Sequence, residues 1–195
     1  MLKIAITGNI ASGKSVVESI LNEKGIDVFD SDKASHDIMS FDASAISEIK
    51  DLLSKYDVLD SNGDLSREKI GKIVFANKGL LKGLESIIHP RIFKLLKDYF
   101  ESKKDDKYLF ASVPVLYEAN MSHYFDKVLL IAADDDIRLD RLIKRNNFSV
   151  EYAKTRIESQ IPQEEKIKLA DYVIYNNGSL DQLKSDVESF LTDLY

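Results

Sequence analysis

The residues with the clearest chemical meaning lie near the start of the chain, at positions 8–15. This segment reads Gly-Asn-Ile-Ala-Ser-Gly-Lys-Ser and matches the pattern G-x-x-x-x-G-K-[ST] at every fixed position. In such a loop, backbone N–H groups and the N-terminus of the following helix hold the phosphates of a nucleotide. The pattern predicts that Lys14 reaches the β- and γ-phosphates and that the Ser15 hydroxyl binds Mg²⁺. The segment therefore predicts a site for ATP or GTP.

The sequence on either side of this loop supports the prediction. The apolar residues 2–6 are typical of a short buried strand, and residues 15–24 predict a helix that ends at Gly25. A glycine turn that only resembles a phosphate loop is the alternative. The order of strand, glycine loop and helix favours the phosphate loop, because that order is the context the motif requires.

Two carboxylates follow the second predicted strand, residues 26–29, in the run Asp30-Ser31-Asp32. Ligands of open α/β sheets bind at the carboxyl ends of the strands. Phosphoryl transfer to an alcohol needs a group that accepts the hydroxyl proton, and carboxylates help to hold the metal. We therefore predict Asp32 as the base, with a role on the metal through water; capping of the next helix is the alternative. His36 lies one helical turn later and could approach the same cleft.

Arginine is unevenly distributed, and most arginines fall between residues 138 and 156. Arg138, Arg141 and Arg145 are spaced i, i+3, i+7, so a helix would carry them on one face. Guanidinium groups bind phosphate oxygens in pairs and neutralise charge that develops during transfer. We interpret residues 134–165 as a helical lid over the nucleotide; an ordinary exposed amphipathic face is the alternative.

Five short apolar runs predict buried strands at residues 2–6, 26–29, 108–113, 128–132 and 172–175. Both faces of these runs are apolar, as in parallel strands that are covered on both sides. Helical patterns separate the runs, so the predicted class is α/β with a parallel sheet.

The stretch between the second and third predicted strands is far longer than a crossover helix needs. Apolar residues recur in it at helical spacing, and Pro90 predicts a kink or a restart of its helix. We predict one domain, 1–195, in which a helical subdomain, 33–100, is inserted into a core of 1–32 and 101–195. We expect the insertion to hold the second substrate, with His89 and Arg91 as candidate contacts for an anionic acceptor. A purely structural insertion is the alternative.

Composition excludes several classes of protein. The 195 residues include no cysteine, which excludes disulfides, thiolate-ligated zinc and a catalytic thiol. The formal net charge of −6 argues against a broad electrostatic grip on nucleic acid. No apolar run approaches the ~20 residues of a membrane span, and no signal-peptide pattern is present. We expect a cytoplasmic protein that acts on a small molecule and has no membrane or nucleic-acid partner. We expect it to be a monomer; an oligomer is the alternative.

Several motifs, in order along nearly the whole chain, resemble those of the dephospho-CoA kinase family. They are the segments 7–15, 30–32 with His36, 62–67, 74–75, 84–90 and 113–118, then Arg141, Arg145, Arg156, Gln160 and the segment 170–178. The phosphate loop is shared by many kinases and GTPases. The Asp-x-Asp pair, His89-Pro90 and the late Asn176-Asn177-Gly178 are much more specific as a set.

The resemblance implies a three-layer P-loop kinase core with a parallel sheet, an inserted helical CoA-binding subdomain and a helical lid. It implies that ATP and Mg²⁺ are used to phosphorylate the ribose 3′-hydroxyl of dephospho-CoA, the last step of coenzyme A synthesis. The catalytic residues it implies are Asp32, Lys14 and Arg141, with Ser15 and Asp32 at the metal. The nucleotide-binding residues are Gly8, Asn9, Ile10, Ala11, Ser12, Gly13, Lys14, Ser15, Arg141, Arg145 and Asn177. The acceptor-binding residues are Asp32, His36, Arg67, His89 and Glu118.

The chain departs from the family pattern at a few positions. Asn9 and Ala11 stand where the family usually has glycine, which changes the backbone freedom of the loop. Arg138 stands where glutamine is common, and Tyr117 where an aliphatic residue or phenylalanine is common. No acidic residue ends the third predicted strand, so we expect the metal to rely on Ser15, Asp32 and water.

Three alternatives remain at this point. Another nucleoside or nucleotide kinase would share the core but use a different acceptor. A GTP-dependent switch would read guanine with an Asn-Lys-x-Asp segment, and here Asn77-Lys78 is followed by Gly79-Leu80. A nucleotide-binding module without catalysis is the third alternative, and Asp32 argues against it because it is a suitable base.

Overall fold

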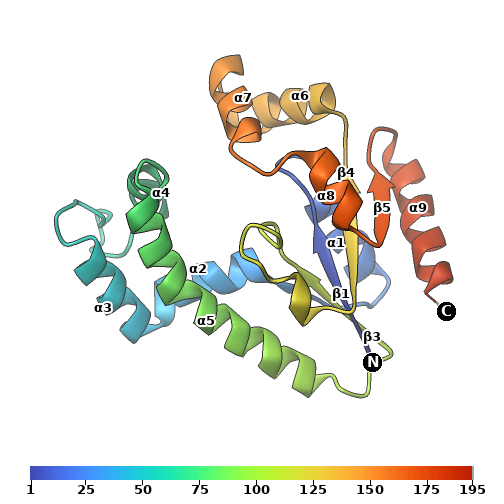
Figure 1. The fold of residues 1–195 in the computed structure, drawn as a ribbon, viewed down its shortest axis with the longest axis horizontal. Coiled ribbons are helices and arrows are strands. Elements are labelled where there is room, and N and C mark those ends of the chain that lie inside the picture. The colour runs from blue at the N-terminus through green and yellow to red at the C-terminus, as the bar shows by residue number, and fades with distance from the viewer. Residues whose placement is uncertain (195) are drawn as a thin grey trace. The chain divides into compact units, whose positions relative to one another are not determined.

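The computed structural model describes residues 1–194, and its centre is a five-stranded parallel sheet (Figure 1). The strand order is β2-β3-β1-β4-β5. The strands are β1 Leu2–Thr7, β2 Val28–Asp30, β3 Tyr108–Ser112, β4 Lys127–Ala132 and β5 Tyr172–Tyr175. All neighbouring pairs are parallel, which confirms the predicted α/β class.

The helices divide between two compact units. The first unit, which we call the core unit, comprises Met1–Asp30 and the chain from Lys103 onward; the second, the helical unit, is Ser31–Ser102. The helices of the core unit are α1 Lys14–Glu23, α6 Asp135–Asn146, α7 Val150–Glu158, α8 Gln163–Leu169 and α9 Leu180–Asp193, with a 3₁₀ turn at Ser122–Tyr124. The helices of the helical unit are α2 Ser31–Phe41, α3 Ala43–Leu52, α4 Arg67–Phe75 and α5 Lys78–Ser102.

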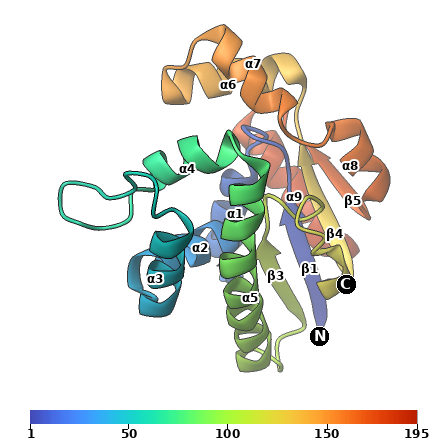
Figure 2. The ribbon, with the colours of Figure 1, turned by 60° about the vertical axis from the view of Figure 1, so that its left-hand side comes forward.

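Both faces of the central strands are buried, which explains why they are apolar throughout. One face carries Ile4, Ile6, Phe110 and Ile131, which pack into the same hydrophobic cluster as residues of α1 and α9. Side chains alternate along a strand, so Ala5 and its neighbours on β3 and β4 face the other side, where they are also buried. Figures 1 and 2 show α1 and α9 near each other, as their contacts require.

The carboxyl ends of three strands meet at one edge of the sheet. Ser112 at the end of β3 is in register with Ile6 of β1 on one side and with Asp30 of β2 on the other. The phosphate loop follows β1 directly, at Gly8. The register therefore brings Asp30 and Ser112 to the edge of the sheet from which the loop leaves.

The helical unit is built around α5. Helices α2, α3 and α4 all pack against it, and Ile88, Ile92 and Leu96 contribute buried side chains from α5. The predicted restart at Pro90 is wrong, because α5 continues through it from Lys78 to Ser102. Pro90 is exposed, so the helix loses one backbone hydrogen bond while the buried face around it keeps its packing.

Arg91 of α5 ties the helical unit together. Its guanidinium group donates to the carboxylates of Asp42 and Glu48 and to the Ile87 carbonyl, at 3.2, 2.6 and 2.6 Å. The hydrogen bond that Arg91 donates to the Glu48 carboxylate is the main reason that the pKa of Arg91 is raised above its usual value. Arg91 therefore has a structural role here, and its contacts within the protein explain its position without an anionic acceptor.

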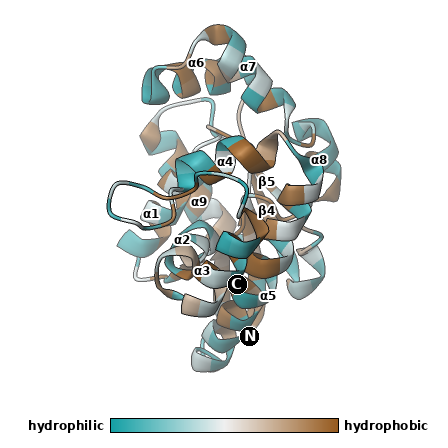
Figure 3. Ribbon diagram, turned by 90° about the vertical axis from the view of Figure 1, so that its left-hand side faces the viewer, coloured by the Kyte–Doolittle hydropathy of each residue, from teal (hydrophilic) through white to brown (hydrophobic). Residues whose placement is uncertain are grey.

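The helical unit contains a long polar loop between α3 and α4. The loop between α3 and α4 is mainly hydrophilic (Figure 3), and within it Leu59 and Leu65 form an isolated antiparallel bridge. Gly63 at the turn has a φ of +85°, which glycine adopts without strain. Within residues 1–194 we find no helix of the length and apolarity that crossing a membrane requires.

Candidate active site

The phosphate loop has a backbone that only glycine fits at two positions. Gly13 has a φ of +99°, and a Cβ there would lie 2.0 Å from Nδ2 of Asn176. A Cβ on Gly8 would lie 2.5 Å from the carbonyl oxygen of Ile131. Ala11 also adopts a positive φ, of 63°, in the left-handed region. The loop thus keeps its curved shape although the chain has alanine where glycine is usual, at some cost in backbone strain.

Asn176, directly after β5, and Arg141, on α6, both hold the loop. Asn176 Nδ2 donates to the Ser12 carbonyl at 2.9 Å. Arg141 Nη2 donates to the Asn176 carbonyl at 2.9 Å, and Nη1 lies 3.4 Å from the Ser12 carbonyl. These contacts place the Arg141 guanidinium beside the loop, where a positive charge can act on bound phosphate.

A second set of contacts joins the start of the loop to the segment between α7 and α8. Ile10 N donates to Gln160 Oε1 at 2.7 Å, and Asn9 Nδ2 donates to the Ile161 carbonyl at 2.9 Å. Asn9 is almost fully buried. A movement of the 160–161 segment would therefore pull directly on the backbone that cradles the phosphates.

Lys14, the lysine of the motif, lies in a three-membered polar cluster. Its Nζ is 2.9 Å from Glu18 Oε1 and 2.6 Å from Ser112 Oγ, and Ser112 Oγ is 2.6 Å from the same Glu18 oxygen. The Lys14 and Glu18 side chains are 15% and 14% exposed. The lysine is thus held at the end of β3, beside the loop, with one carboxylate as its counter-ion.

The arginine row of α6 is divided by the fold. Figure 1 shows α6 and α7 together at one end of the core unit, and Figure 2 shows the same from another side. Arg138 is buried, with Nη2 2.5 Å from Asp135 Oδ1, while Arg145 is exposed and donates to Asn146. The three arginines do not form one exposed face, because Arg138 lies on the buried side with Leu142.

Glu118 forms an ion pair with a lysine that has no exposed surface. Lys166 of α8 is fully buried, and its Nζ lies 2.7 Å from Glu118 Oε1. Tyr117 precedes Glu118 in the chain. Burial raises the pKa of the Tyr117 hydroxyl to about 12, and the negative charge of nearby Asp171 adds to the shift. Tyr117 therefore stays protonated at neutral pH and cannot serve there as a base.

The residues present fit a nucleotide with its metal. The loop offers a cradle, Lys14 a cation, and Ser12 Oγ is buried with no hydrogen-bond partner among the described residues. Ser15 is exposed in the first turn of α1. Within residues 1–194 no group of three acidic or histidine side chains forms a metal site by itself. A Mg²⁺ ion here would therefore take most of its ligands from phosphate and water, as is usual for this ion.

Comparison with known proteins decides the family. The model of the dephospho-CoA kinase family (CoaE) matches residues 2–182. The chain belongs to the dephospho-CoA kinase family. It is 41% identical to the dephospho-CoA kinase of Fusobacterium nucleatum over 189 residues, covering 96% of this chain and 95% of that protein. It is 36% identical to that of Geobacillus kaustophilus over 192 residues, covering 97% and 95%.

Solved structures agree with this membership. A crystal structure of a Thermus thermophilus protein has a TM-score of 0.86 at 31% identity, covering 100% of this chain and 98% of the other. The dephospho-CoA kinase of Campylobacter jejuni has a TM-score of 0.73 at 31% identity, covering 98% and 96%. Shikimate kinase from Acinetobacter baumannii, at 16% identity and a TM-score of 0.55, shares the fold. The predicted P-loop kinase fold is thereby confirmed.

The predicted site residues of this kinase are divided between the core unit and the helical unit. The core unit holds the loop, Arg141, Arg145, Glu118 and Asn177, whose Oδ1 accepts from Asp134 N at 2.9 Å. The helical unit holds Asp32 and His36 on α2, Arg67 at the start of α4 and His89 on α5, next to Phe93. Asp32, His36 and Arg67 are exposed and His89 is half-buried. The described contacts give Glu118 and Asn177 partners within the protein.

Several residues that contact the loop, among them Asn176, Gln160 and Glu18, were not predicted to do so. Asn176 and Gln160 lie in the family motifs, but their sequence positions do not reveal that they bind the loop. Glu18 carried no signal except its spacing of four residues from Lys14, which places both on one face of α1. A carboxylate at this spacing after a phosphate-loop lysine is the pattern that could have found it.

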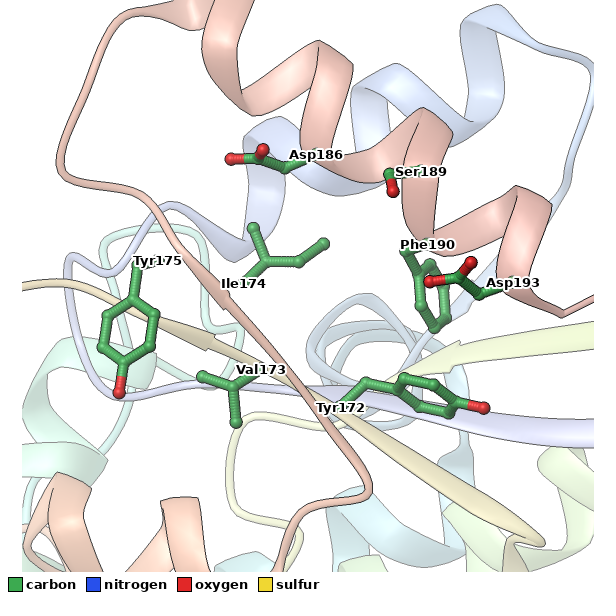
Figure 4. Close-up of a pocket in the computed structure, with 8 residues that line it drawn as sticks. All are labelled: Tyr172, Val173, Ile174, Tyr175, Asp186, Ser189, Phe190 and Asp193. Atoms are coloured by element: carbon green, nitrogen blue, oxygen red, sulfur yellow. The ribbon is translucent and has the colours of Figure 1, made fainter.

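One hollow on the core unit lies apart from these residues. It has a volume of about 370 Å³ and lies between β5 and α9 (Figure 4). Its lining residues, which include Tyr172, Phe190 and Asp186, contain no member of the phosphate loop and none of the predicted site. The hollow therefore does not contribute to the site described here.

Proposed function

We propose that this chain transfers the γ-phosphoryl group of ATP to the ribose 3′-hydroxyl of dephospho-CoA, giving coenzyme A and ADP, with Mg²⁺ as the metal. Family membership supports the acceptor. The use of ATP as the phosphoryl donor is supported by one observation: the phosphate cradle of residues 8–15, with Lys14 Nζ held at the end of β3. A cytoplasmic location and a monomeric state remain predictions of the sequence.

Residues of the core unit are assigned to the nucleotide. The loop N–H groups bind the phosphates, and Lys14 exchanges its present partners for the β- and γ-phosphate oxygens. Arg141, which already lies beside Ser12, neutralises charge that develops on the transferred group. Ser15 and Asp32 are assigned to the metal, which when bound neutralises phosphate charge. Arg145 and Asn177 complete the nucleotide contacts.

Residues of the helical unit are assigned to the acceptor. Asp32 accepts the proton of the attacking 3′-hydroxyl, since it is an exposed carboxylate that follows Asp30, the last residue of β2. His36, Arg67 and His89 are assigned to binding dephospho-CoA, together with Glu118 of the core unit. Their exposure or partial exposure in α2, α4 and α5 is the structural support for this assignment.

An acceptor panel tests the function. ADP release is measured with ATP, Mg²⁺ and one acceptor at a time: dephospho-CoA, adenosine, AMP, uridine or water. We expect release only with dephospho-CoA, with a product heavier by one phosphoryl group. Release with a different acceptor would keep the kinase core but contradict the proposed substrate, and release with none would contradict the reaction.

A further inference from the structure

The end of β3 lacks the carboxylate that would serve a metal in many phosphate-loop proteins, where an aspartate holds Mg²⁺ together with the loop hydroxyl. In this chain the position is Ser112, between Ile6 of β1 and Asp30 of β2 in the register of the sheet. The Ser112 side chain is fully buried and ends in a hydroxyl. A hydroxyl supplies no negative charge to a divalent cation.

A carboxylate nevertheless reaches this place from the neighbouring helix. Glu18 of α1 accepts hydrogen bonds from Ser112 Oγ at 2.6 Å and from Lys14 Nζ at 2.9 Å, both through the same oxygen, Oε1. Its side chain is only 14% exposed. Ser112 therefore ties the Glu18 carboxylate to the end of β3.

The position of Glu18 on α1 relates it to the predicted metal ligand. Ser15 and Glu18 are spaced i, i+3, so they are neighbours on one face of the helix, and Lys14 lies four residues from Glu18 on the same face. We propose that Glu18 is a positioning residue that adds, from α1, a second carboxylate to the metal site assigned to Ser15 and Asp32, and so makes nucleotide binding depend on Mg²⁺. This inference rests on the proposed use of ATP with Mg²⁺.

Electrostatics gives the reason for this dependence. Without nucleotide, the ammonium of Lys14 neutralises Glu18. When Lys14 turns to the phosphates, the carboxylate of Glu18 stays bound to Ser112 and faces a polyanion. Like charges so close in a partly buried site repel strongly. A divalent cation with its water shell removes the repulsion, so Glu18 disfavours metal-free nucleotide and favours the Mg²⁺ complex.

The test compares nucleotide affinity with and without the metal. Dissociation constants of the non-hydrolysable analogue AMPPNP are measured by calorimetry in excess Mg²⁺ and in EDTA, for the full chain and for Glu18→Gln. We expect Glu18→Gln to bind the metal-free analogue at least as tightly as the parent chain. We expect it to reduce the Mg²⁺-dependent gain in affinity by about tenfold, the size of a typical coupling between two bound ligands.

A rescue variant separates this role from a purely structural one. Glu18→Ala with Ser112→Asp moves the carboxylate from α1 to β3, and we expect it to restore most of the Mg²⁺-dependent gain lost in Glu18→Ala. Glu23→Gln, on the same helix but at the surface, is the matched control and should leave both constants unchanged. Thermal unfolding of each variant shows that the comparison is made on folded protein.

Other results would overturn the inference. Equal weakening of both constants in Glu18→Gln would mean that Glu18 only supports the fold of the loop. An unchanged Mg²⁺-dependent gain, or no rescue by Ser112→Asp, would mean that its carboxylate does not act on the metal. A parent chain whose affinity does not depend on Mg²⁺ would refute the proposed cofactor itself and, with it, the role of Glu18.

Discussion

At the scale of single residues, Gly13 is constrained in two independent ways. Its φ is +99°, and a Cβ would collide with the amide of Asn176, which itself holds the Ser12 carbonyl. Gly13→Ala must therefore both strain the backbone and displace Asn176. Gly25 also has a positive φ, of 76°, but a Cβ there would meet no atom within 4 Å.

We expect Gly13→Ala to lower the free energy of unfolding by about 3 kcal/mol and to weaken ATP binding. Gly25→Ala, the matched control, should cost only the backbone term, about 1 kcal/mol, and leave ATP binding unchanged. Urea unfolding and nucleotide titration measure both effects. Equal losses in the two variants would contradict the role given to Asn176.

Asp32 is the residue on which the chemistry depends. Asp32→Asn removes the proton acceptor but not the phosphate cradle, so we expect kcat to fall by at least about 10²-fold while ATP affinity changes little. Steady-state kinetics and nucleotide titration give the two values. Asp37→Asn, on the same helix, is the control. Turnover like that of the parent chain in Asp32→Asn would end the assignment of the base.

At the scale of elements, the ion pair of Glu118 and Lys166 joins α8 to the segment after β3. Lys166 has no exposed surface, so Glu118→Gln would leave a buried ammonium without a counter-ion. We expect a loss of about 2–3 kcal/mol in unfolding free energy, and a smaller loss, about 1 kcal/mol, for Lys166→Met, which removes the charge instead.

The same two variants test the acceptor role of Glu118. If Glu118 contacts the substrate directly, Glu118→Gln should raise the KM for dephospho-CoA. Lys166→Met keeps the carboxylate of Glu118 and should leave that KM unchanged. Chemical denaturation and steady-state kinetics on both variants give the comparison. An unchanged KM in a folded Glu118→Gln variant would show that this carboxylate serves the fold alone.

Asp171, which directly precedes β5, is hydrogen-bonded to the start of β4. Burial opposes its ionisation, but hydrogen bonds from Lys127 Nζ and Val128 N outweigh this, so its pKa lies below the usual 3.8. Because the pKa is lower in the folded chain, the stability it contributes is complete above the unfolded value and is lost as pH falls through the folded value.

For Asp171→Asn we expect a loss of roughly 1 kcal/mol at neutral pH, since the side chain is partly exposed and solvent screens the pair. The difference from the parent chain should shrink at acid pH, below about pH 4. Urea unfolding at several pH values measures it. A difference that stays constant with pH would contradict the ionic origin of this contribution.

Local pattern was sufficient to predict most elements of this chain. Each of the five strands overlaps the apolar run that predicted it, with β2 shifted from 26–29 to Val28–Asp30. Helix α1 ends at Glu23, two residues before Gly25, which has a φ of 76°. Of the kink or restart predicted at Pro90, the restart does not occur, because packing along α5 keeps the helix continuous. Arg138 was misjudged because periodicity cannot distinguish a buried charged face from an exposed one.

At the scale of the whole molecule, the site depends on contacts that no local pattern contains. The motif predicted the loop, and the loop is present with its strand and helix. The partners that hold it, Gln160, Asn176 and Ser112, lie about a hundred residues or more away in sequence. Only the order of the strands brings them to the loop. Gln160 and Asn176 could be recognised as parts of family motifs, and Ser112 carried no signal, but no contact with the loop could be assigned to any of the three.

The residues assigned to catalysis come from both units. Lys14 and Arg141 belong to the core unit, whereas Asp32 and His36 belong to the helical unit. The peptide between Asp30 and Ser31 joins the end of β2 to the start of α2, so the proposed base lies within the first turn after this junction. The reaction we propose is therefore a property of the whole chain and of neither unit alone.

The most direct test of the central claim is the position of the phosphoryl group in the product. The full chain is incubated with ATP, Mg²⁺ and dephospho-CoA, and the product is examined by mass spectrometry and by proton–phosphorus correlation NMR. We expect one added phosphoryl group whose phosphorus couples to the ribose H3′. Coupling to H2′, extension of the pyrophosphate, or no product at all would contradict it.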